Sequence, residues 1–235
     1  MKVSIIIPVF NEANTVCEVL KKVQKSRFPK GVTKEIIVVN DASDDDTLLE
    51  IKKSRVKFRL LNHSINKGKG AAVRTGLSYS TGDLILIQDA DLEYNPSYYP
   101  KLLAPFLDTN VQVVYGSRLA NFPLILFGAH KTFLPLHLVA NKVLTSFTAQ
   151  LFQQTITDME TGYKIINRQL AKSLNLKSNR FDIEPEITAK ILKRGVKIIE
   201  VPIKVKPRSY TEGKKVGWRD GLVAIWTLLK YRFVD

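Results

Sequence analysis

Residues 82–93 read Gly-Asp-Leu-Ile-Leu-Ile-Gln-Asp-Ala-Asp-Leu-Glu, a short apolar run that ends in acidic residues. The run from Leu84 to Ile87 has the length and composition of a buried β-strand. Asp89 and Asp91 follow it directly, so the strand would deliver both carboxylates to its carboxyl end. Proteins usually hold Mg²⁺ or Mn²⁺ through one or two carboxylates together with substrate phosphates. The stretch therefore predicts a metal-held diphosphate, and the motif alone leaves a solvated turn open as the alternative.

The first half of the chain alternates strand patterns with helix patterns. Such alternation predicts an α/β fold with a Rossmann-like, mostly parallel sheet flanked by helices. Asn11 is the expected cap of the first helix. The expected strands are 3–7, 35–39, 56–61, 84–87 and 111–115, and the expected helices are 12–26, 46–53, 70–80 and 95–107.

The second half is less regular, and we expect it to complete one domain over residues 1–235. Helices are expected at 134–152, 183–193 and 217–233, with Gly195 ending the second of them. A strand is expected at 197–201, a short edge strand at 203–205 and a mobile basic loop at 206–216.

Polar segments follow four of the expected strands, at residues 8–12, 40–46, 62–70 and 89–93. In parallel sheets ligands bind at the carboxyl ends of the strands, so these segments should meet at one edge. Asp41 is placed to accept hydrogen bonds from a nucleobase or ribose, and Ser43 or Asp45 to cap the next helix.

A glycine-lysine loop, Asn66-Lys67-Gly68-Lys69-Gly70, precedes the third expected helix. Main-chain amides at a helix N-terminus, together with nearby ammonium groups, favour an anion. The spacing is not that of a Walker A loop. A tight turn with glycines for close packing is the equally weighted alternative.

Composition narrows the class of protein. Cys17 is the only cysteine, which excludes a disulfide framework and a thiolate zinc site and is consistent with a reducing cytosol. The first residues do not form a signal peptide, and no apolar run is long enough to span a bilayer. The histidines show no metal spacing, and we expect His63 and His130 at the surface or in loops.

Positive charge is concentrated in the second half of the chain. The formal net charge is +14; residues 1–120 hold 17 Lys and Arg against 13 Asp and Glu, and residues 121–235 hold 19 against 9. The halves therefore carry +4 and +10. Such a field concentrates anionic partners such as phosphorylated substrates or lipid head groups. A nucleic-acid-binding module remains a remote alternative, without any recognition motif.

Taken in order, these motifs resemble glycosyltransferase family 2 with the GT-A fold. The segments that carry this resemblance are 7–12, 39–43, 67–70 and 89–91. Later segments are similar to the branch of dolichyl- or polyprenyl-phosphate mannose (or glucose) synthases, and these are 116–118, 157–164, 181–186 and 212–220. Asn40 stands where aspartate is frequent in the family, and Ala42 where glycine is frequent.

The resemblance implies an inverting transfer of a hexose from a GDP- or UDP-sugar to a polyprenyl or dolichyl phosphate. It implies a nucleotide-sugar half at 1–120, a basic acceptor-side half at 121–235, a Mg²⁺ or Mn²⁺ ion, and a peripheral position on the cytoplasmic membrane face, with or without a membrane-protein partner. No nucleic acid is expected as a partner. The implied nucleotide-sugar residues are Pro8, Phe10, Glu12, Asp41, Lys69, Asp89, Ala90 and Asp91; the metal residues are Asp89, Asp91 and Glu93; the catalytic residues are Asp89, Asp91, Asp158, Arg118 and Arg208; the acceptor residues are Arg118, Lys131, Arg208, Lys214 and Lys215.

The acceptor decides which mechanism is needed. A phosphate monoester has a second pKa of about 6, so at neutral pH its oxygen can attack without a general base. Arginine, as a bidentate donor, suits such a phosphate best. A sugar hydroxyl would instead need a carboxylate to take its proton, and Asp158 is then the first candidate, with Glu160 and Glu184 behind it. Two other hypotheses for Asp158 remain open. It could be a helix cap or the structural partner of Lys164, or it could shape the acceptor pocket.

Overall fold

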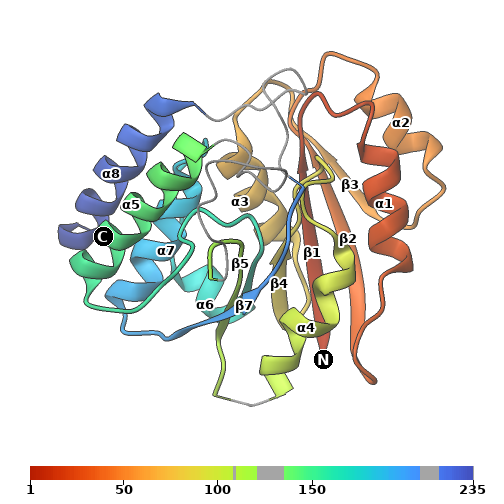
Figure 1. The fold of residues 1–235 in the computed structure, drawn as a ribbon. Helices are drawn as coiled ribbons and strands as arrows, with labels where there is room; N and C mark the ends of the chain where they lie inside the picture. The colour runs from red at the N-terminus through yellow and green to blue at the C-terminus, as the bar shows by residue number, and fades with distance from the viewer. Residues whose placement is uncertain (108–109, 121–134, 207–216, 235) are drawn as a thin grey trace, which may run out of the picture.

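The computed structural model describes residues 1–107, 110–120, 135–206 and 217–234. These residues form a seven-stranded sheet in the order β3-β2-β1-β4-β6-β5-β7, with helices on both faces (Figure 1). No helix in the described ranges is both long and apolar enough to cross a bilayer. The strands are β1 (Lys2–Val9), β2 (Thr33–Asn40), β3 (Arg59–Asn62), β4 (Leu84–Ile87), β5 (Val113–Ser117), β6 (Lys164–Asn167) and β7 (Ile198–Pro202). The helices are α1 (Val16–Lys25), α2 (Thr47–Lys53), α3 (Lys69–Tyr79), η1 (Pro96–Tyr98), α4 (Tyr99–Leu103), η2 (Ala104–Leu107), α5 (Pro135–Phe152), α6 (Arg168–Ser173), α7 (Ile183–Lys193) and α8 (Trp218–Phe233).

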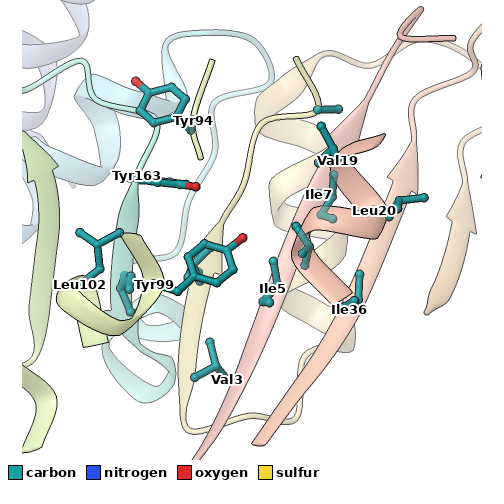
Figure 2. Packing of buried hydrophobic residues seen from close by; sticks show 14 of the residues in the cluster. Val3, Ile5, Ile7, Val19, Leu20, Ile36, Tyr94, Tyr99, Leu102 and Tyr163 are labelled. Carbon is teal, nitrogen blue, oxygen red and sulfur yellow. The ribbon is translucent and has the colours of Figure 1, made fainter. Parts of the chain in front are cut away.

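Strand β1 lies in the interior of the sheet, between β2 and β4, and is buried on both faces. Val3, Ile5 and Ile7 alternate along it and pack with Leu20 of α1 in one core cluster (Figure 2). Ile6 points to the opposite face, where α3 crosses the strand. Helix α3 can approach β1 closely because Gly76 has no Cβ atom; a Cβ atom there would collide with the Ile6 side chain.

The prediction of a mostly parallel sheet is confirmed. β1 pairs in parallel with β2 and β4, β2 with β3, and β5 with β7. The sequence analysis missed β6, which runs antiparallel between β4 and β5. Only two of its four residues, Lys-Ile-Ile-Asn, are apolar, so it does not stand out as a buried strand in the way that Leu84–Ile87 does.

Several predicted boundaries were wrong. Helix α1 begins at Val16, and Asn11 caps no helix, because its side chain bonds Asp44 in the neighbouring loop. The third strand starts at Arg59 rather than Val56, and residues 203–205 form no strand. The helix expected at 95–107 is divided into η1, α4 and η2.

Candidate functional site

A cleft of about 500 Å³ opens at the carboxyl ends of the strands. Parallel register brings the ends together: Val9 lies opposite Asn40, and Asn40 opposite Asn62. The polar segments after β1, β2, β3 and β4 therefore meet at one edge, as expected. The predicted site residues that line the cleft are Pro8, Phe10, Glu12, Asp41, Lys69, Asp89, Ala90, Asp91, Glu93 and Arg118. Lys131, Arg208, Lys214 and Lys215 lie outside the described residues.

Asp41 organises the loop that leads into α3. Its carboxylate accepts hydrogen bonds from the main-chain N–H groups of Lys67 (2.9 Å) and Gly68 (2.7 Å). These two amides therefore bind a carboxylate of the protein itself rather than a substrate anion. This finding supports the alternative that the glycines form a tightly packed turn. Gly68, at φ 93°, leaves room for the carbonyl of Asn179, which a Cβ atom would strike.

His63 completes this arrangement. It lies in the loop after β3, which agrees with the expectation of a surface or loop position, but its side chain is not at the surface. Its side chain is buried, with Nδ1 2.6 Å from the Asp41 Oδ1 atom and Nε2 2.9 Å from the Thr75 hydroxyl. A carboxylate offers about four acceptor positions, of which His63, Lys67 and Gly68 occupy three. One acceptor position on the Asp41 carboxylate thus remains, and Asp41 lines the cleft.

Three loops at this edge contain residues in the left-handed backbone region. Asn11 (φ 51°), Ala42 (φ 57°) and Leu92 (φ 64°) each follow a predicted site residue directly. This conformation costs free energy for a residue with a Cβ atom, most of all for a large one such as leucine. The turn at Leu92 sharply ends the segment that carries the paired aspartates.

Lys69 lines the cleft and pairs with two carboxylates. Its ammonium lies 2.7 Å from Asp89 Oδ1 and 2.9 Å from Glu184 Oε1. Glu184 also binds Lys164 through its other oxygen. Burial opposes the charged forms, but the opposite charges prevail: the pKa of Lys69 is raised, and Lys164 and Lys69 hold the pKa of Glu184 down at about 2.

Asp89 and Asp91 both line the cleft with hard oxygen ligands. The Asp89 carboxylate can lie against Gly162 because this glycine has no Cβ atom, which would collide with the carboxylate. The Oδ1 atom of Asp91 accepts a hydrogen bond from the Glu93 N–H at 3.1 Å. No three or more His, Cys, Asp or Glu side chains converge as a ready set of metal ligands in the part of the chain that the structure describes. Mg²⁺ or Mn²⁺ bound through one or two carboxylates and substrate phosphates does not need such a set. The pair therefore fits a metal that binds with a diphosphate.

Arg118 reaches the cleft from the end of β5 and is fixed by Asp158. The Nε and Nη2 atoms of Arg118 each donate to a different oxygen of Asp158, at 2.8 Å, and the Arg118 main-chain N–H donates to the same carboxylate. Asp158 is fully buried and does not line the cleft. The suggested pairing of Asp158 with Lys164 was wrong, since Lys164 bonds Glu184 instead.

Glu160 is the carboxylate of this region that does line the cleft. One of its oxygens, Oε1, is buried without a hydrogen-bond partner. Burial, reinforced by the negative charges of Glu184 and Asp158, raises the pKa of Glu160 to about 7 against the opposing charges of Lys164 and Arg118. A carboxyl group with this pKa exchanges a proton near neutral pH, as a general base must.

Comparison with known proteins decides the family. The family model described as "Glycosyl transferase family 2" matches residues 4–174. The chain belongs to that family. It is 28% identical over 214 residues to a dolichyl-phosphate beta-glucosyltransferase of Trichomonas vaginalis, covering 85% of this chain and 64% of that protein. It is 27% identical over 228 residues to a dolichol-phosphate mannosyltransferase of Pyrococcus furiosus, covering 92% of this chain and 60% of that protein.

The fold of this glycosyltransferase is GT-A. A crystal structure of glucosyl-3-phosphoglycerate synthase from Mycobacterium tuberculosis, in complex with Mn²⁺, UDP and phosphoglyceric acid, superposes with a TM-score of 0.76. The two sequences are 20% identical, and the match covers 100% of this chain and 79% of that one. This likeness concerns the fold alone.

Several residues of the glycosyltransferase cleft had no role in the sequence analysis. Asn66, Phe181 and Asp220 lay inside quoted motifs but were given no role of their own, so a signal existed for them. Tyr94 directly follows the predicted metal residue Glu93. Asn141 had no signal, because only the packing of α5 brings it to the cleft. The division into halves at residue 120 stays a prediction.

Proposed function

We propose that this glycosyltransferase moves a hexose, with inversion, from a GDP- or UDP-sugar to a polyprenyl or dolichyl phosphate at the cytoplasmic face of a membrane. The observation that carries the proposal is the composition of one cleft. It combines the aspartate pair and Lys69, on the donor side, with Arg118, held ready by Asp158. The names of the two dolichyl- and dolichol-phosphate relatives support this acceptor class.

On the donor side, the remaining acceptor position of Asp41 suits an N–H group of a nucleobase. Asp89 and Asp91, with Glu93 beside them, would hold Mg²⁺ or Mn²⁺. When bound, the ion would neutralise charge that develops on the leaving diphosphate. Lys69 adds a second positive charge within reach of that group, because it already contacts Asp89.

On the acceptor side, Arg118 would align a lipid phosphate. A guanidinium has five N–H donors, and Asp158 takes two of them, at Nε and Nη2. The other three suit phosphate oxygens. The phosphate is already ionised at neutral pH, so alignment opposite the leaving group is the main requirement. Arg208, Lys131, Lys214 and Lys215 remain predicted contributors from the sequence.

A transfer assay tests this proposal. The protein and Mg²⁺ or Mn²⁺ are incubated with radiolabelled sugar nucleotides, one at a time, and with polyprenyl phosphate in detergent. We expect label from one donor to pass into organic solvent, and none when polyprenol replaces its phosphate. Hydrolysis of a donor without any transfer to polyprenyl phosphate would contradict the lipid acceptor while leaving the family assignment intact.

Glu160 favours a second candidate, transfer to a hydroxyl group. The sequence analysis named Asp158 first as the general base, but both Asp158 oxygens bind Arg118 behind the cleft surface. Glu160 lines the cleft, and its pKa near 7 suits proton removal. In this alternative Glu160, rather than Asp158, would take the proton from the acceptor hydroxyl.

Glu160→Gln separates the two candidates. With a hydroxyl acceptor the change should lower kcat by about 10²–10³-fold and remove an acidic limb near pH 7 from the rate profile. With a phosphate acceptor the rate should change less than about threefold, because no base is needed. The variant is measured beside the wild type on both acceptor classes, and sugar-nucleotide binding serves as the control for folding.

A further inference from the structure

Helix α8 presents apolar side chains on the side opposite its packed face. Leu222, Trp226 and Phe233 lie four and seven residues apart, so they share one side of the helix. All three are exposed, with Trp226 at 68% and Phe233 at 78%. Ala224 and Leu228 are buried on the other side. The outer side of a surface helix is normally polar. Because this side of α8 is apolar instead, contact with another molecule would remove its apolar area from water.

The neighbouring helix α5 extends this surface. Val139 and Val143, four residues apart, are both exposed, and α5 packs beside α8 at the edge of the molecule (Figure 1). Together they hold seven of the thirteen exposed large hydrophobic residues in the described chain, a concentration that marks an interaction surface. We call this surface the apolar face; its residues are Val139, Val143, Leu222, Val223, Ile225, Trp226 and Phe233.

The charged residues of α5 and α8 are almost all basic. Lys142, Arg219 and Lys230 are exposed on the same two helices, and Arg232 is partly exposed. Asp220 is the only acidic residue of α5 and α8, and its carboxylate accepts the Gly217 N–H at 2.7 Å as a helix cap. Apolar side chains, an exposed tryptophan and basic neighbours form the pattern that binds an anionic membrane interface. A symmetric second copy would place the basic groups opposite one another.

The same two helices reach the cleft. Asn141 of α5 and Asp220 of α8 both line it. We propose that the apolar face docks onto an anionic lipid bilayer and so holds the cleft beside the membrane surface. The proposed docking is inferred from the residues of the apolar face and the basic residues beside it. A role of docking in catalysis rests, in addition, on the proposed lipid-phosphate acceptor.

Vesicle binding without donor or acceptor tests the docking directly. The full chain is sedimented with vesicles of phosphatidylcholine alone or of phosphatidylcholine with phosphatidylglycerol. We expect cosedimentation with the anionic vesicles, weakened by salt. The chain has two tryptophans, so a Trp218→Phe background reports on Trp226 alone, whose fluorescence brominated lipids should quench. No binding to anionic vesicles, or binding without quenching, would overturn the proposal.

A matched pair of variants locates the surface. Trp226→Glu should weaken vesicle binding at least tenfold. Leu107→Glu, at a residue of similar exposure (69%) outside the apolar face, should leave it unchanged. Lys230→Gln should weaken it about fivefold, the effect of one basic group near an anionic surface. Thermal unfolding and sugar-nucleotide binding should be equal in all three. Equal losses in Trp226→Glu and Leu107→Glu, or a concentration-dependent dimer that Trp226→Glu dissociates, would refute membrane docking.

A short-chain, water-soluble isoprenyl phosphate distinguishes this inference from the proposed function. Trp226→Glu should transfer sugar to it as fast as the wild type does, but should lose transfer to polyprenyl phosphate in vesicles. Wild-type binding to vesicles without transfer to either acceptor would refute the proposed function alone. Equal transfer by both proteins in vesicles would refute the role of docking in catalysis.

Discussion

The proposed donor side and the proposed acceptor side of the cleft are held together by different kinds of interaction. On the donor side, Asp41 binds main-chain amides of the loop before α3, and the loops follow neighbouring parallel strands. On the acceptor side, the side chain of Arg118 is oriented by Asp158, forty residues away in the sequence. Asp41 is thus held mainly by main-chain hydrogen bonds at the strand ends, whereas Arg118 is held by a side-chain ion pair.

The largest expected effect is on the donor side. Asp91→Asn should lower transfer by about 10³-fold, because the variant loses a negative charge needed to hold the cation on the diphosphate. The measurement is the initial rate of transfer over a titration of Mn²⁺. Asp46→Asn, an exposed acidic residue that does not line the cleft, is the matched control and should keep the wild-type rate. If the wild type transferred sugar without metal nearly as fast as it does with Mn²⁺, the assignment of Asp91 to a metal site would be wrong.

Arg118→Lys tests the acceptor side. Lysine retains the charge but cannot bind Asp158 and a phosphate at once through a planar fork, so we expect transfer to fall about 10²-fold. The loss should appear in the acceptor KM and in kcat, with donor binding within about twofold of the wild type. If donor binding falls as much as transfer does, Arg118 belongs to the donor side and the comparison fails.

The difference between the two sides also explains what the sequence could predict. The aspartate pair, the Asp41 turn and Lys69 each follow a recognisable strand, so their meeting at one edge followed from sheet topology. Other features depend on contacts between distant segments, and no local pattern predicts them. These are the ion pair of Arg118 with Asp158, the ion pair of Lys164 with Glu184, and the insertion of β6 between β4 and β5. Short, weakly patterned elements such as β6 form because the strands on either side need a partner, which no local pattern reveals.

His63→Ala should have a smaller effect, confined to the donor. Removing the imidazole leaves Asp41 with its two main-chain partners but without the contact from His63, so the carboxylate becomes less fixed. We expect the donor KM to rise about tenfold with little change in kcat. His63→Asn, which retains a donor of similar reach, should recover part of the loss. Equal effects on donor KM and acceptor KM would show that His63 acts on the fold rather than on the donor side.

The smallest effect on activity is expected at the opposite edge of the sheet, where Glu35 joins the starts of β1, β2 and β4. Its carboxylate accepts hydrogen bonds from Lys2, Ser4, Thr81 and Gly82. Partial burial opposes ionisation, but the bonds from Lys2, Ser4 and Thr81 prevail and lower the pKa of Glu35 from 4.5 to about 2. A lowered pKa means that ionised Glu35 stabilises the fold above about pH 4.5, and that this contribution disappears as the pH falls toward 2.

Glu35→Gln should therefore lower the free energy of unfolding by roughly 2 kcal/mol at neutral pH, after allowance for partial solvent exposure. The difference from the wild type should shrink when urea unfolding is repeated at about pH 3. Transfer activity at neutral pH should stay within about twofold of the wild type, because Glu35 lies away from the cleft residues. A stability difference that is constant over this pH range would show that the shape of the side chain, rather than its charge, joins the strands. A loss of activity as large as that of Arg118→Lys would show that the two edges of the sheet are coupled.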